Sequence, residues 1–169
     1  MNNYKFISAL RELADENSYI IGYGAHELRK IEALYNINIQ GQFREFMLLA
    51  GRCSGGLVGD EPIILYRPAW NVRTQILFQV KLLDYLLNAR AYDYVGKSAK
   101  TFCFSWENES RYYYLITEHD DNLVYCYDEN EESVECTGLT LFEYLDLMYE
   151  EESQRGHVIC RGELLEIYV

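Results

Sequence analysis

The sequence lacks any long uncharged run. Its apolar stretches fall far short of the roughly 20 residues that a helix needs to cross a bilayer. The first residues, MNNYKF, also lack the basic segment followed by an apolar one that is typical of a secretion signal. We therefore expect a cytoplasmic protein with no membrane partner.

Cysteine pairs at metal-binding spacing are also missing. The five cysteines include no Cys-x-x-Cys pair, so neither a disulfide framework nor a thiolate zinc site is indicated. Asp128, Asn130 and Glu132 alternate as in a calcium loop. Ser133 and Leu139, however, stand where such a loop needs a glycine and a bidentate glutamate. The sequence therefore predicts no metal and no cofactor.

Basic residues are almost absent from one part of the chain. Residues 107–152 hold 15 Asp and Glu against the single Arg111, a net charge of −14, whereas the whole chain carries −12. Such a field repels phosphate backbones and anionic membranes, and it favours either a basic protein partner or simple solubility. We expect no nucleic-acid partner.

What the chain does contain is the pattern of one mixed domain. Its 169 residues, 49% of them hydrophobic, suffice for a single domain over residues 1–169. Residues 101–106, 111–117 and 123–127 alternate apolar and polar side chains, as in an antiparallel meander. Thr140 with Glu143 forms a capping box that begins an amphipathic helix. The expected fold is α+β, a mostly antiparallel sheet with helices packed on it.

Other elements are expected around this sheet. Apolar spacing predicts helices over residues 4–16, 25–35, 42–50 and 72–91. The third should end at Gly51 in a left-handed C-cap, and a stripe of Ile76, Val80, Leu83 and Leu87 indicates the fourth. Four shorter segments complete the expectation: a loop at 51–59, an edge strand or packed turn at 63–66, a polar connector at 150–156 and a terminal strand at 163–169.

Sixteen tyrosines are the strongest compositional signal. Strand alternation means that those in the meander cannot all be buried on one face, so some should be exposed. Tyrosine is enriched in binding hot spots, although it also suits half-buried sheet positions. The tyrosines concerned are Tyr112, Tyr113, Tyr114, Tyr125, Tyr127 and Tyr144.

A catalytic thiol is a weaker interpretation. Cys53 would need a neighbouring base such as His26 or His157 to act as a nucleophile, and nothing in their spacing supports such a pairing. We therefore expect a protein that is not an enzyme.

The order of these parts resembles the SUKH superfamily, which includes bacterial immunity proteins and fungal cell-wall synthesis regulators. The resemblance covers about residues 22–152 and leaves 153–169 as a C-terminal extension. Its residues are the helix around Ile31-Glu32-Ala33-Leu34, the helix from Phe43 to Ala50, the Ser54-Gly55-Gly56 turn, the strands around Phe102 and Val124, and the helix from Phe142 to Tyr149. It implies helices on an antiparallel sheet, no catalytic residues, and binding to a toxin delivered by a competing cell.

Resemblance and charge together suggest a function. An immunity protein would neutralise a cognate protein toxin, such as a nuclease, by stoichiometric binding through acidic and aromatic side chains. The alternative is a non-catalytic regulatory interaction module with no toxin partner, and the oligomeric state stays open. The expected partner-facing residues are Glu118, Asp120, Asp121, Tyr125, Tyr127, Asp128, Glu129, Glu131 and Glu132.

Overall fold

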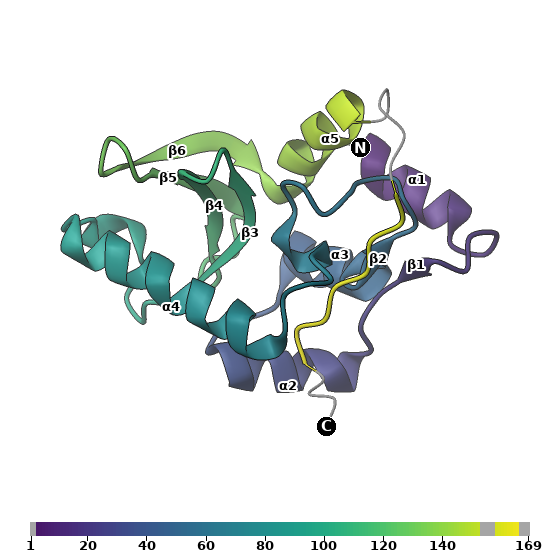
Figure 1. Cartoon of the computed structure of the whole chain (residues 1–169), viewed down its shortest axis with the longest axis horizontal. Helices are drawn as coiled ribbons and strands as arrows, with labels where there is room; N and C mark the ends of the chain where they lie inside the picture. The colour runs from purple at the N-terminus through teal and green to yellow at the C-terminus, as the bar shows by residue number, and fades with distance from the viewer. Residues whose placement is uncertain (1–2, 153–157, 166–169) are drawn as a thin grey trace.

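The computed structural model describes residues 3–152 and 158–165. Within these residues the chain forms an α+β fold, with helices packed on an antiparallel sheet (Figure 1), as the sequence predicts. The elements in chain order are α1 (Lys5–Leu13), β1 (Ile20–Ile21), α2 (Ala25–Tyr35), α3 (Gly41–Ala50), β2 (Cys53–Ser54), α4 (Val72–Asn88), β3 (Thr101–Glu107), β4 (Arg111–Ile116), β5 (Leu123–Asp128), β6 (Ser133–Thr140) and α5 (Leu141–Glu152). In this part of the chain no helix is long and apolar enough to cross a membrane.

The main sheet is a four-stranded meander in the order β3-β4-β5-β6. One row of the register runs across the sheet from Glu107 to Arg111, Asp128 and Ser133. Helix α4 covers one face of the sheet, and α5 lies on the other face together with the N-terminal helices (Figure 1). Strand β6 extends the three strands expected from the sequence.

Both faces of the sheet are covered, and this corrects the expectation of exposed tyrosines. Tyr112, Tyr114 and Tyr127 are buried beneath α4, whereas Tyr144 of α5 is buried against the opposite face. Tyr113 and Tyr125 are half-buried. Alternation does split the strand tyrosines between two faces, but each face has its own hydrophobic core.

The predicted helices agree with the structure, but the predicted end of one of them does not. Helix α2 has the predicted bounds, and the capping box before α5 is present: the Thr140 N–H donates to Glu143 Oε2 at 2.8 Å. Gly51, however, has a right-handed φ of −62°. A Cβ there would lie 2.6 Å from the Tyr23 ring, so close packing, and not a left-handed cap, explains the glycine.

The face of helix α4 that packs on the sheet is not the apolar stripe from which the helix was predicted. The side chains buried against the sheet are Phe78, Leu82 and Leu86. Val80 and Leu87 of the expected stripe are exposed. The helix therefore carries apolar residues on two sides, and only one of these sides contacts the sheet.

Two predictions for the C-terminal part of the chain need correction over the residues that the structure describes. Residues 150–152 complete α5 and are not a connector. Residues 163–165 form no strand; this segment crosses the molecule beside β2, with the Gly162 N–H donating to Arg52 O at 3.0 Å. The remainder of both predictions, at 153–156 and 166–169, lies outside the described residues.

The two edges of the main sheet differ. At the β3 edge the Gln79 amide of α4 pairs with Cys103, donating to its carbonyl at 2.8 Å and accepting from its N–H at 2.7 Å. The Trp106 N–H donates to Pro62 O, and Ile63 forms a β-bridge with Ser105. Residues 64–66 then make a buried 3-10 turn. The β6 edge has no strand beside it in the described part of the chain.

Candidate interaction surface

Carboxylates gather at one end of the main sheet. The β3–β4 and β5–β6 turns lie at this same end because the strands form an antiparallel meander. The Glu129 N–H donates to Ser110 O at 2.8 Å and joins the two turns. We call this region the acidic end; it comprises Glu107, Glu109, Asp128, Glu129, Glu131 and Glu132.

The β5–β6 turn is shaped by one of its own carboxylates. Asp128 Oδ1 accepts the N–H groups of Asn130 at 2.9 Å and Glu131 at 3.4 Å, and Asp128 Oδ2 lies 3.6 Å from Arg111 Nε. The main role of Asp128 is therefore to stabilise the turn. Glu131 and Glu132 project from it as exposed carboxylates.

The tyrosines near this turn belong to the core. The Tyr112 hydroxyl donates to Glu129 Oε2 at 3.1 Å. Burial raises the pKa of Tyr127, and the carboxylates of Glu132 and Glu129 raise it further. Tyr127 is only 3% exposed, and Tyr125 packs edge-on to Tyr94. These rings support the acidic end from beneath and offer a partner little area.

The remaining expected residues lie at the opposite end of β5. Six strand residues separate the two groups, a distance of roughly 17 Å. Glu118 Oε1 accepts the Ser98 N–H at 3.0 Å, and Asp121 Oδ1 accepts the Leu123 N–H at 3.1 Å. Asp120 is exposed in the same turn. The structure thus divides the expected surface into two groups.

The acidic end also contains two residues that were not among the expected partner-facing residues. Glu107 and Glu109 come from the β3–β4 turn, and the predicted meander contains the signal that could have found them, because its alternate turns share an end. Beside them is an open hollow of about 350 Å³. It is lined by Asp60, Glu61, Arg67, Trp106, Asn108 and Glu109.

This hollow has an aromatic wall and a net negative lining. The Arg67 guanidinium lies against two indoles, 4.8 Å from the Trp70 centroid and 5.1 Å from the Trp106 centroid. Three carboxylates, from Asp60, Glu61 and Glu109, face a single arginine. A lysine or arginine side chain from a partner matches such a lining in charge and size.

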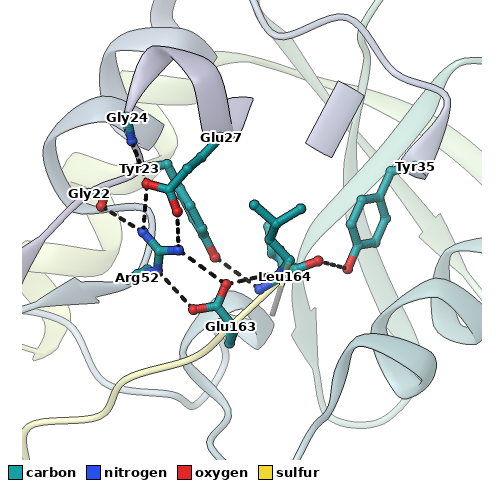
Figure 2. Close-up of polar contacts among 9 residues, drawn as sticks. Gly22, Tyr23, Gly24, Glu27, Tyr35, Arg52, Glu163 and Leu164 are labelled. Atoms are coloured by element: carbon teal, nitrogen blue, oxygen red, sulfur yellow. Dashed lines mark hydrogen bonds and ion pairs between the residues drawn. The ribbon is translucent and has the colours of Figure 1, made fainter. Parts of the chain in front are cut away.

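A second polar cluster fastens the C-terminal segment (Figure 2). Arg52 donates from all five of its N–H groups to Glu27, Glu163 and the Gly22 carbonyl, and it stacks 4.1 Å from the centroid of the Tyr23 ring. The Leu164 N–H donates to the Tyr23 hydroxyl, and the Tyr35 hydroxyl donates to Leu164 O. No donor of Arg52 is left for a ligand, so the role of the cluster is structural.

The charges of this cluster are tightly coupled. Hydrogen bonds from Arg52, and then from the Gly24 N–H, lower the pKa of Glu27 to about 2. Burial alone would lower the pKa of Arg52, but hydrogen bonds to both carboxylates outweigh it and raise that pKa. Glu27 and Arg52 are therefore both ionised at neutral pH.

The residues considered for thiol chemistry are placed as follows. Cys53 is buried in β2, and its Sγ accepts the Gly55 N–H at 3.4 Å. His26 is exposed on α2 beside Arg29, while His157 lies outside the described residues. Among residues 3–152 and 158–165, no three His, Cys, Asp or Glu side chains converge on a point where a metal ion could bind.

No family model, curated protein or solved structure matches the chain. The fold and the surface therefore define a class of molecule only: an α+β domain whose meander ends in a group of exposed and half-buried carboxylates.

Proposed function

We propose that this protein is a cytoplasmic immunity protein of the SUKH type, which neutralises a cognate protein toxin by stoichiometric binding at the acidic end. The observation that carries the proposal is the gathering of six carboxylates at one end of the sheet, in two turns and the strand ends beside them, with Arg111 as the basic residue paired with one of them, Asp128. The helix-covered antiparallel meander, in the chain order that the resemblance implies, is further support.

The mechanism is occlusion aided by charge. A toxin that acts on an anionic substrate such as a nucleic acid has a basic cleft, and exposed carboxylates compete for that cleft. Opposite charge accelerates the encounter, and the effect falls with salt because the Debye length is about 8 Å at physiological ionic strength. Glu131 and Glu132 are the leading contacts because both are exposed at the tip of the turn.

Two neighbouring features would add specificity. The hollow beside Trp106 can hold one cationic side chain of the toxin. The open edge of β6 offers unpaired backbone groups to an extended segment of the toxin. Because these features lie at opposite edges of the sheet, two separate segments of the toxin would occupy them.

The first experiment identifies the partner. The tagged protein is purified from its native host, any bound chain is identified, and that chain is expressed in a test cell with and without this protein. Rescue of growth together with a one-to-one complex supports the proposal. A partner that is not toxic, bound at the same surface, would instead favour the regulatory module.

The second experiment tests the surface with matched charge changes. The double variant Glu131→Lys/Glu132→Lys should slow association with the toxin about tenfold at low salt and reduce its salt dependence. The control Asp120→Lys/Asp121→Lys makes the same charge change at the opposite end of β5 and should associate more nearly as the wild type does. Equal effects of the two variants would mean that net charge alone matters and that the acidic end is not the binding site.

A further inference from the structure

Helix α4 exposes an apolar stripe on the side that faces away from the sheet. Leu77, Val80 and Leu87 lie on this side, and the Val80 side chain is 57% exposed. Leu34, at the end of α2, is also exposed and lines the same groove as Val80. Several large apolar side chains exposed on one side of a helix mark a candidate interaction surface.

The stripe borders a groove of about 240 Å³ between α4 and the end of α2. Its apolar walls come from Leu34, Ile76, Val80 and Leu83. A groove with such walls accepts an aliphatic side chain from another helix, as the hole on one helix accepts the knob of its partner.

The charges along the stripe indicate which helix supplies the side chain that fills the groove. Lys81 and Asp84 are exposed on the same side of α4, three residues apart. If two copies of α4 pack antiparallel about a two-fold axis, Lys81 of each copy lies beside Asp84 of the other; parallel packing would set like charges opposite each other. The acid surplus of the chain lies elsewhere, since residues 72–91 contain three bases and one acid.

We propose that the protein forms a homodimer through the α4 stripe, with the two α4 helices antiparallel and the groove beside Leu34 of each copy filled by aliphatic side chains of the other. The proposal does not depend on the proposed function, because the surface is a different one. The contact is short, so dimerisation should be reversible and concentration-dependent.

Sedimentation equilibrium of the full chain over a range of concentrations tests this directly. Val80→Asp should weaken dimerisation about a hundredfold, because it places a carboxylate in an apolar contact. The control Leu147→Asp makes a comparable change on α5, where Leu147 is 49% exposed on the other side of the sheet. It should dimerise as the wild type does. Circular dichroism verifies that both variants fold.

A charge exchange tests the antiparallel arrangement. Lys81→Asp and Asp84→Lys should each weaken dimerisation about tenfold, because the two-fold axis repeats every unfavourable contact. The double variant Lys81→Asp/Asp84→Lys should recover to within about threefold of the wild type. A variant that merely disturbed the helix would not be rescued by the second change.

Three results would overturn the proposal. The first is a wild-type protein that stays monomeric at the highest concentration reached. The second is a dimer that persists in Val80→Asp, which places the contact on another face. The third is a double variant no better than the single ones.

Discussion

Replacement of Arg52 by methionine should destabilise the protein strongly. The Arg52 side chain is 7% exposed and joins Glu27 of α2 to Glu163 of the C-terminal segment. Methionine keeps the apolar stem but leaves two carboxylates without their base. It also deprives the Gly22 carbonyl of a donor. The perturbation therefore removes charge pairing while it keeps most of the packing.

The magnitude follows from how deeply each partner is buried. Removing one member of a buried ion pair costs about 3 to 5 kcal/mol. Here Glu163 is 17% exposed and Glu27 is 33% exposed, so both carboxylates regain some water. We expect the lower figure, about 3 kcal/mol, which corresponds to a fall in melting temperature of roughly 6 to 12 °C for a domain of this size.

The same network makes a contribution that depends on pH. Glu27 has its pKa lowered from 4.5 to about 2 by Arg52 and the Gly24 N–H. A carboxylate with a lowered folded pKa stabilises the protein above its unfolded pKa and loses that contribution as pH falls through the folded value. The window is therefore between about pH 4.5 and pH 2. Because Glu27 is one-third exposed, we expect about 1 kcal/mol from it.

Urea unfolding at pH 7 and at several acidic values measures both effects. Arg52→Met should lower the midpoint at pH 7 and flatten the acid-side loss of stability. The control is Lys5→Met, which removes the exposed ion pair with Glu150 and should change little. If Arg52→Met unfolds at the wild-type midpoint, the network does not hold the C-terminal segment as described.

Three further predictions concern other parts of the molecule. Gln79→Leu should cost about 2 to 3 kcal/mol in urea unfolding, because the backbone N–H and carbonyl of Cys103 both lose their partner beneath α4. Gly22→Ala should cost more than about 3 kcal/mol or prevent soluble expression, because the new Cβ would lie 1.8 Å from Leu48 O, whereas Gly24→Ala, whose Cβ meets nothing closer than 3.5 Å, should be tolerated. Iodoacetamide should label the exposed Cys136 first and leave Cys103 unlabelled until unfolding, because burial raises the pKa of the Cys103 thiol; peptide mass spectrometry at rising pH checks the order.

Local sequence signals predicted the helices well. The bounds of α2 follow from its apolar stripe and from Glu27, which accepts the Gly24 N–H. Thr140 and Glu143 mark the start of α5 in the same way. Strand β6 has no such signal, because Glu135, Cys136 and Gly138 all face solvent at an open edge. An edge strand buries too little to impose a period-two pattern.

The candidate surface was harder to predict because it depends on topology. Residues 118–132 are continuous in the sequence, but β5 carries one end of that stretch away from the other. Glu107 and Glu109 are distant in the sequence and yet share an end of the sheet with Glu131. Proximity along the chain groups acids correctly only within one turn. Across a meander, alternate turns lie at the same end of the sheet, so acids from alternate turns come together.

Helix α4 shows why periodicity alone could not assign the buried face. Its apolar residues form two stripes, and the one against the sheet includes the polar Gln75, whose amide donates to Ile64 O at 2.9 Å. Scored by hydrophobicity, the stripe through Val80 is the better candidate for the core, yet it faces outward. A stripe that is core-like in composition and exposed in the monomer has a simple physical explanation: a second surface buries it. The outward position of Val80 therefore supports the dimer.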